Sequence, residues 1–252
     1  MCAHFEPDSP KRCAKTSRNH IGLKSLGETR IVAAMVETKA PIQDAHDANK
    51  ETSRPSSRKT SLVVPIRSLG ANHRERITRH LLELDHRDRY LRFGFAANDD
   101  QVKRYADSLN FERDEIFGIY NRRIHLIAMA HLAFSANSKL KPLAEFGVSV
   151  LKSARGRGYG ARLFDRAAMH ARNDGISRMF IHALSENGAM LKIARNAGAT
   201  VERDGSESEA YLNLLPPTID TRLTEMFQEQ MAKTDYRIKV QVKHIRDLLG
   251  GV

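Results

Sequence analysis

One stretch constrains the fold more than any other part of this sequence: "SVLKSARGRGYGARLFDRAAMHARNDG", from Ser149 to Gly175. A β-prone apolar run ends in a turn rich in arginine and glycine, and a segment with helical periodicity follows at once. Glycines at such a turn let the backbone approach a ligand closely, because no Cβ intervenes. The first amides of the next helix lack intrahelical partners and carry the positive end of its dipole. The stretch therefore predicts a strand–turn–helix unit that binds a diphosphate.

The spacing of this turn excludes two other nucleotide-binding motifs. A Walker motif requires Gly-Lys-Ser/Thr, which the turn lacks. A dinucleotide fingerprint requires G-x-G-x-x-G, whereas Gly156, Gly158 and Gly160 give G-x-G-x-G, and no βαβ unit opens the chain. Arg155 and Arg157 would add positive charge around the phosphates. A tight turn without a ligand is the alternative interpretation.

Strand-like and helix-like segments alternate around this unit, which predicts an α/β domain with a mixed central sheet. Pro65 in the first expected strand favours an edge position or a bulge, and Asn72 is the expected cap of the first helix. The turn at 121–123 predicts a hairpin, and Gly205 a second one. The expected strands lie at 61–69, 114–120, 124–134, 144–152, 177–184 and 199–214, and the expected helices at 72–85, 86–95, 98–109, after Gly160, and at 186–199.

The two ends of the chain differ from this central part. Residues 1–60 are rich in Pro, Ser, Thr and Lys without a sustained apolar period, so we expect a disordered tail in which Met35 is an alternative start. We expect the folded domain at 61–215. A helical extension is expected at 216–252, where Ile219, Leu223, Met226, Ile238, Val242, Ile245 and Leu249 form one stripe. We expect this stripe to pack on its own domain, and a homodimer contact is the alternative.

The composition of the chain limits the compartments and the kinds of partner that we expect for this protein. Cys2 and Cys13 are the only cysteines, so a disulfide framework and a zinc site are not expected. No apolar run approaches the roughly 20 residues that span a bilayer, and we expect a cytoplasmic protein with no membrane partner. The net charge of +11 attracts anions in general. Because no helix-turn-helix or aromatic-interleaved basic stripe accompanies this charge, nucleic acid is not the expected partner.

The turn and its flanks resemble one known family. "RGRGYG", Arg155 to Gly160, is similar to the R/Q-x-x-G-x-G/A pyrophosphate loop of the GNAT superfamily of N-acetyltransferases. "AEFGVSVL", 144–151, looks like the fourth strand of that family, and "SENGAMLKIARNAGATV", 185–201, resembles its N-x-x-A-x-x-L-Y-x-K-x-G-F segment. "RHLLELDHRDRYLRFGF", 79–95, is similar to a segment of bacterial members, including the acetyltransferase domains of protein-acetylating enzymes. The resemblance runs from Ser61 to Leu215 and implies the GNAT fold, with a mixed sheet of six to seven strands.

The resemblance also implies a co-substrate, acetyl-CoA or another acyl-CoA, and no metal. In the family, the fourth and fifth strands diverge where the pantetheine arm enters and pairs with the fourth strand. Val150 matches the residue whose amide bonds the thioester carbonyl, and Asn187 matches an asparagine that contacts the CoA arm. The positions carried over for donor binding are Val148, Val150, Arg155, Gly156, Arg157, Gly158, Tyr159, Gly160 and Asn187.

The catalytic side chains follow the family pattern only in part. Glu145 matches a glutamate that acts as general base in several protein-acetylating members, and strand alternation places it opposite Phe146 and Val148. An ion-paired glutamate at a strand edge is the alternative. The tyrosine that often protonates the leaving thiolate is replaced by Ala194. Water, Ser185, Tyr211 or His182 are candidate substitutes.

We therefore expect an N-acetyltransferase that acts by direct attack of a primary amine, on a small molecule or a protein lysine. We expect the charged side chains of 79–95 to form a solvated helix face, and the alternative is that Glu83 or Asp85 contacts the acceptor if the acceptor is cationic. The rival interpretation is a non-catalytic protein of the same fold that binds acyl-CoA as a sensor or regulator.

Overall fold

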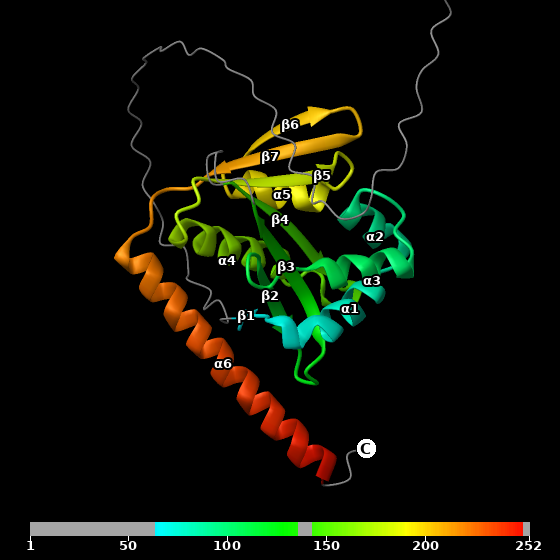
Figure 1. The fold of residues 1–252 in the computed structure, drawn as a ribbon, viewed down its shortest axis with the longest axis vertical. Helices are drawn as coiled ribbons and strands as arrows, with labels where there is room; N and C mark the ends of the chain where they lie inside the picture. Colours follow the sequence, from blue (N-terminus) through cyan, green and yellow to red (C-terminus); the bar gives the residue numbers. More distant parts are fainter. Residues whose placement is uncertain (1–63, 136–142, 249–252) are drawn as a thin grey trace, which may run out of the picture. The chain divides into compact units, whose positions relative to one another are not determined.

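A seven-stranded mixed sheet organises the described residues, 64–135 and 143–248, of this computed structural model (Figure 1). Its order is β1-β2-β3-β4-β5-β7-β6, and every neighbouring pair is antiparallel except β4 and β5. The strands are β1 Arg67–Ser68, β2 Glu115–Tyr120, β3 Leu126–Phe134, β4 Leu143–Val150, β5 Arg178–Leu184, β6 Thr200–Asp204 and β7 Glu207–Asn213. The parallel pair forms the centre of the sheet, and a helix connects its two strands.

Helices cover the two faces of this sheet unequally. On the face that carries Gly147 and Ser149 lie α1 Arg74–Leu82, α2 His86–Phe93 and α3 Asp99–Ser108. On the opposite face lie α4 Tyr159–Asn173 and α5 Gly188–Asn196. The long helix α6, Ile219–Leu248, runs beside α4 and β1 (Figure 1).

The core between β4 and α4 follows the predicted periodicity. Phe146 meets Phe164 with ring centroids 5.1 Å apart, in an edge-to-face arrangement. Both side chains are fully buried, and burial of each one stabilises the fold by roughly 1.5–3 kcal/mol. The rest of the apolar face of α4 is buried with them, at Leu163, Ala167 and Ala171.

The mixed sheet is confirmed, and most predicted elements lie within a few residues of their expected places. The strand expected at 61–69 is reduced within the described residues to β1, which is an edge strand as Pro65 suggested. Asn72 does not cap the first helix: it lies inside a 3-10 turn, Ala71–His73, and α1 begins one residue after His73 without a side-chain cap. By contrast, α3 has a side-chain cap, because Asn98 forms a full capping box with Gln101.

The prediction that the stripe of the C-terminal extension packs on its own domain is wrong for α6. The helix is continuous, and Ala232 is its only buried residue. It attaches through polar groups instead: Arg166 of α4 lies 3.2 Å from carboxylate oxygens of both Glu225 and Glu229, and His170 lies 2.6 Å from Glu225. A buried arginine on α4 therefore decides which face of α6 turns inward.

Residues 1–63, 136–142 and 249–252 lie outside the described part of the chain, and with them the expected tail, the alternative start at Met35 and Leu249. Among the helices described here, none has the length and apolar character to cross a membrane. The described ranges also hold no group of three or more His, Cys, Asp or Glu side chains placed to bind a metal.

Candidate active site

The backbone of β4 is open toward β5 beyond Glu145. The two strands pair only at Leu143, Ala144 and Glu145, whose partners are Arg178, Met179 and Phe180. The other edge of β4 stays paired with β3 as far as Val150. The strands thus diverge after Glu145, as the resemblance predicts.

The register on β3 shows which groups face this gap. The amides of Ser135 and Leu151 donate to Leu143 and Ile127, so the hydrogen-bonded pairs fall on odd-numbered residues of β4. Opposed residues alternate between bonded and non-bonded pairs in an antiparallel ladder. Val148 and Val150 are therefore non-bonded toward β3, and their amides point into the gap. We call the backbone of these two residues the open edge.

The glycine loop, Arg155–Gly160, lies at the end of the open edge. Gly156 and Gly158 have φ angles of +76° and +73°, which L side chains rarely adopt, and a Cβ at either would meet nothing within 4 Å. Gly158 is the N-cap of α4, and the first helical hydrogen bond runs from Arg162 to its carbonyl. Within the described residues, the backbone amides from Gly156 to Ala161 have no hydrogen-bond acceptor. They form an anion-binding arrangement at the helix N-terminus.

Gly160 brings the loop against the open edge. A Cβ at this position would lie 3.1 Å from Cδ1 of Ile193 on α5 and 4.0 Å from Cγ2 of Val150. Glycine therefore lets the first turn of α4 pack between these two neighbours. The loop amides and the open edge consequently form one continuous backbone surface.

Two predicted donor-binding side chains already have partners within the chain. Arg155 forms an ion pair with Asp88 and donates from Nε to the carbonyl of Val150 at 3.3 Å. Asn187 caps α5 by accepting from the amide of Met190 at 3.2 Å, and its Nδ2 donates to the carbonyl of Leu91 at 3.4 Å. Both side chains therefore hold elements beside the gap in place, in addition to any contact they make with the donor.

Glu145 lies at the last residue of the β4–β5 pairing, on the face of the sheet opposite Phe146. Its Oε2 is buried and has no hydrogen-bond partner among the described residues. Burial raises the pKa of its carboxyl above the ordinary value, and the positive charge of Arg92 opposes that shift. A carboxylate with a raised pKa beside an open strand edge is suited to accept a proton near neutral pH.

Arg92 of α2 is held over β4 next to Glu145. A Cβ at Gly147 would lie 2.8 Å from the guanidinium carbon of Arg92, so the arginine occupies the space that a side chain at this position would fill. Arg92 donates to the hydroxyl of Tyr105 on α3 at 2.8 Å. The absence of a side chain at position 147 is thus what brings a positive charge to this face.

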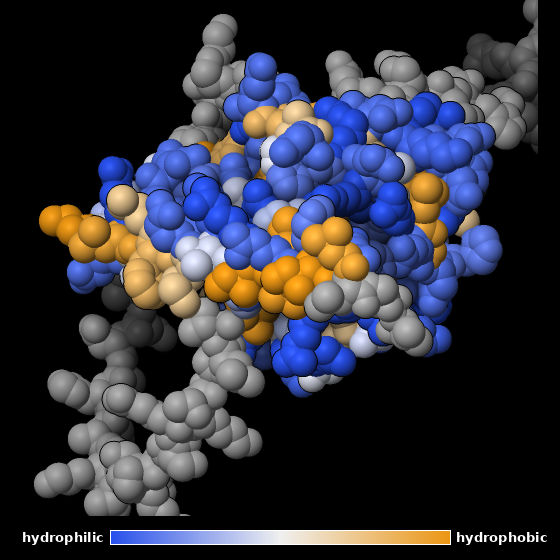
Figure 2. Space-filling view, turned by 90° about the horizontal axis from the view of Figure 1, so that it is seen from below, coloured by the Kyte–Doolittle hydropathy of each residue, from blue (hydrophilic) through white to orange (hydrophobic). Residues whose placement is uncertain are grey.

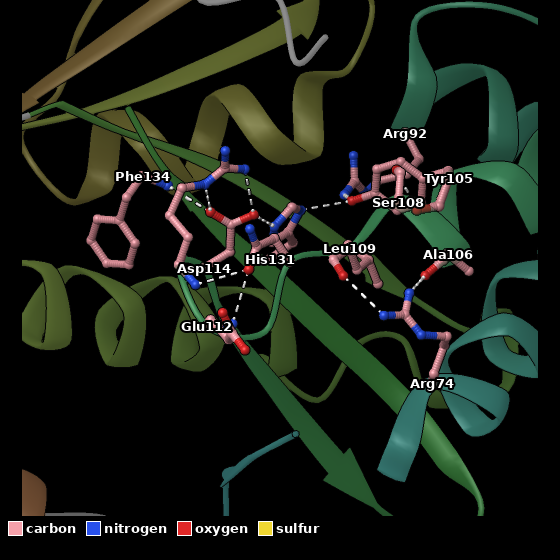
Figure 3. A network of polar contacts seen from close by, with 12 residues as sticks. Arg74, Arg92, Tyr105, Ala106, Ser108, Leu109, Glu112, Asp114, His131 and Phe134 are labelled. Atoms are coloured by element: carbon pink, nitrogen blue, oxygen red, sulfur yellow. Dashed lines mark hydrogen bonds and ion pairs between the residues drawn. The ribbon is translucent and has the colours of Figure 1, made fainter. Parts of the chain in front are cut away.

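A chain of buried polar groups continues from Tyr105 (Figure 3). Its hydroxyl lies 2.9 Å from Nδ1 of His131, and Nε2 of the same ring lies 3.2 Å from Oδ2 of Asp114. Burial opposes ionisation of Asp114, but hydrogen bonds from His131 and Arg113 outweigh it and lower the pKa of Asp114 to about 2. With an ionised Asp114, a neutral His131 donates from Nε2 and accepts from Tyr105 at Nδ1. We call Arg92, Tyr105, His131 and Asp114 the buried relay.

Sequence reasoning missed the buried relay. Its four members come from α2, α3, β3 and the residue before β2, and no local spacing connects them. One weak indication existed: His131 lies in the middle of an otherwise apolar strand, where a polar side chain needs a partner.

The position at which the family often has an acid-acting tyrosine is inaccessible in this protein. Ala194 is fully buried on α5. Ser185 bonds the hydroxyl of Ser208 at 2.8 Å and the carbonyl of Glu207 at 2.9 Å, so it closes the β5–β7 connection. Tyr211 and His182 lie on the same face as Glu145, because both flank Phe180 in the sheet. Burial, followed by the hydrogen bond to Glu209, raises the pKa of Tyr211 to about 12.

Two other expected contacts lie elsewhere. Glu83 pairs with His125 at 2.9 Å beside the β2–β3 turn, and Asp85 caps α2 by accepting from the amide of Asp88. A hollow of about 730 Å³ lies along the outer side of α1, near Glu83 and Asp107. It contains neither the open edge nor Glu145, and its volume therefore does not mark the site.

The comparisons with known proteins agree with this geometry. Residues 78–199 match the model of the acetyltransferase (GNAT) family, and these residues include the open edge, the glycine loop and Glu145. The described fold is similar to the GNAT domain of PAT from S. lividans, with 20% identity and a TM-score of 0.51 over 61% of this chain and 95% of that one. Spermidine N-acetyltransferase from Vibrio cholerae, solved with CoA and spermine, is similar at 16% identity and a TM-score of 0.48, over 60% of this chain and 95% of that one. A search of curated proteins found no significant match.

The described residues form a mixed α/β sheet with flanking helices, which is the GNAT fold. Residues 78–199 of the chain match the acetyltransferase (GNAT) family model, so this part of the chain is a GNAT acetyltransferase domain.

Proposed function

We propose that this protein is an N-acetyltransferase that moves an acetyl group from acetyl-CoA to a primary amine. The observation that carries the proposal is the continuity of the glycine loop with the open edge, which ends at Glu145, whose Oε2 is buried and has no hydrogen-bond partner among the described residues. The loop amides match the pyrophosphate of the donor, and the open edge matches its amide-containing arm. Glu145 supplies the base that deprotonates the acceptor amine.

Each donor-binding residue has a definite part in this proposal. The amides of Arg157, Gly158, Tyr159 and Gly160 bind the pyrophosphate at the start of α4. Val148 pairs with the pantetheine arm as a neighbouring strand would. The amide of Val150 donates to the thioester carbonyl oxygen and stabilises the charge that develops there. Gly156 permits the turn, and Arg155 and Asn187 hold the walls in place.

The reaction is a direct transfer. A protonated amine cannot attack, so Glu145 removes a proton from it, directly or through water. The amine nitrogen then forms a bond to the thioester carbon, and the carbon–sulfur bond breaks. As the amide forms, the nitrogen loses its second proton, and the leaving thiolate takes up one proton through water, His182 or Tyr211, since Ala194 provides none. The raised pKa of Glu145 favours this role near neutral pH.

The acceptor is an amine of a small molecule or a protein lysine, because the site holds a base for an amine and a space open at the β5 side. The rival is an acyl-CoA sensor without catalysis, which the missing tyrosine favours and the unpartnered Glu145 disfavours.

The test measures thiol release from acetyl-CoA with a panel of polyamines, amino acids and lysine peptides, beside calorimetry of CoA binding alone. Release that depends on both amine and enzyme supports transfer. Binding of CoA with no release from any amine would identify the sensor, and a lack of binding would refute the donor site itself.

A further inference from the structure

The outward face of α6 is apolar, although the helix lies on the surface. Its large apolar side chains are between 40% and 78% exposed. Those that form a continuous row are Phe227, Met231, Ile238, Val242, Ile245 and Leu248, which recur at intervals of three, four or seven residues. We call this row the α6 stripe. Figure 2 shows hydrophobic surface gathered on the lower side of the molecule, the side to which α6 extends.

The α6 stripe points away from the domain because the opposite side of the helix is fixed. Glu225 and Glu229 bind Arg166, and Lys239 donates to the carbonyl of Tyr120 at 3.1 Å. The ring of Tyr236 lies 4.0 Å from the guanidinium of Arg67. These anchors repeat from Glu225 to Lys239, so rotation that would bury the stripe requires breaking all of them. Within the described residues nothing covers the stripe.

We propose that the α6 stripe is the contact surface for a second copy of this chain, which pairs its own α6 stripe with it. The row from Phe227 to Leu248 spans about 32 Å at 1.5 Å per residue. Two such helices side by side bury on the order of 1,000 Å² in total, which reaches the lower range of specific interfaces. Apolar side chains spaced by three and four residues interdigitate with an identical row, as in a two-helix coiled coil.

The charge of α6 favours a second copy over other partners. The whole chain has a net charge of +11, which would repel a copy of itself. The helix, however, carries six basic and five acidic side chains. Beside the stripe itself lie one acidic side chain, Asp235, and two basic ones, Arg237 and Arg246, so the stripe carries little net charge. A helix that binds an anionic membrane would instead need a polar face dominated by lysine and arginine, whereas here Glu225 and Glu229 share that face with Lys239 and Lys243.

The test is the solution mass of the full chain, measured by sedimentation velocity without donor over roughly a hundredfold range of concentration. We expect a dimer that dissociates on dilution. Ile238→Glu with Ile245→Glu should give a monomer at every concentration, because two buried carboxylates would face their copies. Val240→Glu is the matched control: it places the same charge on the same helix, but beside Arg79 and Arg123, and should leave the dimer intact.

Circular dichroism and CoA binding show whether the variants are folded, and these readouts do not depend on the mass. If the double variant aggregates, Met231→Glu alone must still weaken the dimer at least tenfold. A wild-type monomer at all concentrations overturns the proposal, and so does a double variant that remains dimeric. A monomer that sediments with phosphatidylserine vesicles would assign the stripe to a membrane surface instead.

Discussion

The proposed donor side and the proposed acceptor side of this site differ in the kind of chemical group that forms them, main-chain groups in one and side chains in the other. The glycine loop and the open edge consist of main-chain groups from one continuous stretch, Val148 to Gly160. The proposed acceptor side consists of Glu145, with the buried relay next to it, and these side chains come from five places in the chain. A backbone site tolerates changes of side chain but not of backbone conformation, whereas a side-chain site depends on each neighbour. The two halves should therefore respond to mutation in different ways.

The largest effect is expected at Gly158. Gly158→Glu should abolish CoA binding in calorimetry, because it strains a backbone with φ of +73° and places a negative charge where the pyrophosphate lies. Gly175→Glu is the matched control, since Gly175 has φ of +79° at the other end of α4 and equally open space. It should cost similar stability and leave donor binding unchanged. Retained affinity in Gly158→Glu would refute the assignment of the loop.

Glu145→Gln tests the acceptor side. It should lower the transfer rate by roughly tenfold to a hundredfold and leave donor binding intact, because the amide cannot accept the proton. The acidic limb of the pH–rate profile should disappear with it. Glu202→Gln, on the exposed strand β6, is the control. A pH–rate profile identical to that of the wild type would remove Glu145 from the mechanism.

The third prediction concerns acid stability. His80 bonds Ser149 of β4 at 2.8 Å and the carbonyl of Leu126 at 2.9 Å, and burial lowers its pKa to about 4. The unfolded chain takes up this proton near pH 6.5 and the folded chain only near pH 4, so stability is complete above pH 6.5 and falls between the two values. The loss should reach roughly 3 kcal/mol. His80→Gln should flatten this dependence in urea unfolding at pH 7 and pH 4.5. An equally steep loss in the variant would place the acid sensitivity elsewhere.

The smallest effect is expected at Asn187, where the two halves meet. Asn187→Ala removes the cap of α5 and should cost about 1 kcal/mol of stability. CoA affinity should fall only severalfold, because the main-chain contacts remain. Asn187→Asp keeps an acceptor for the Met190 amide and should restore the stability. A loss of CoA binding as complete as in Gly158→Glu would show that the asparagine side chain, and not the backbone, dominates this part of the site.

The same contrast explains what the sequence could predict. The strand, the glycine loop and the position of Glu145 follow from local patterns, since glycine spacing and strand alternation act over a few residues. The divergence of β4 and β5 came from the family resemblance. The buried relay could not be predicted, because Tyr105 and His131 meet only after α3 packs on β3. For α6 the sequence predicted only half of the apolar row, Ile238, Val242 and Ile245, and the direction the row faces depends on Arg166, a residue on another helix.

Gly147 has a consequence for how this family of sequences can vary. Because a Cβ there would lie 2.8 Å from the guanidinium carbon of Arg92, the arginine cannot keep its place over β4 when position 147 has a side chain. The guanidinium is the end of a flexible side chain, so Gly147→Ala would displace the positive charge of Arg92 without unfolding β4. Two positions far apart in the chain are thereby expected to change together, and a relative that gains a side chain at one should lose the arginine at the other.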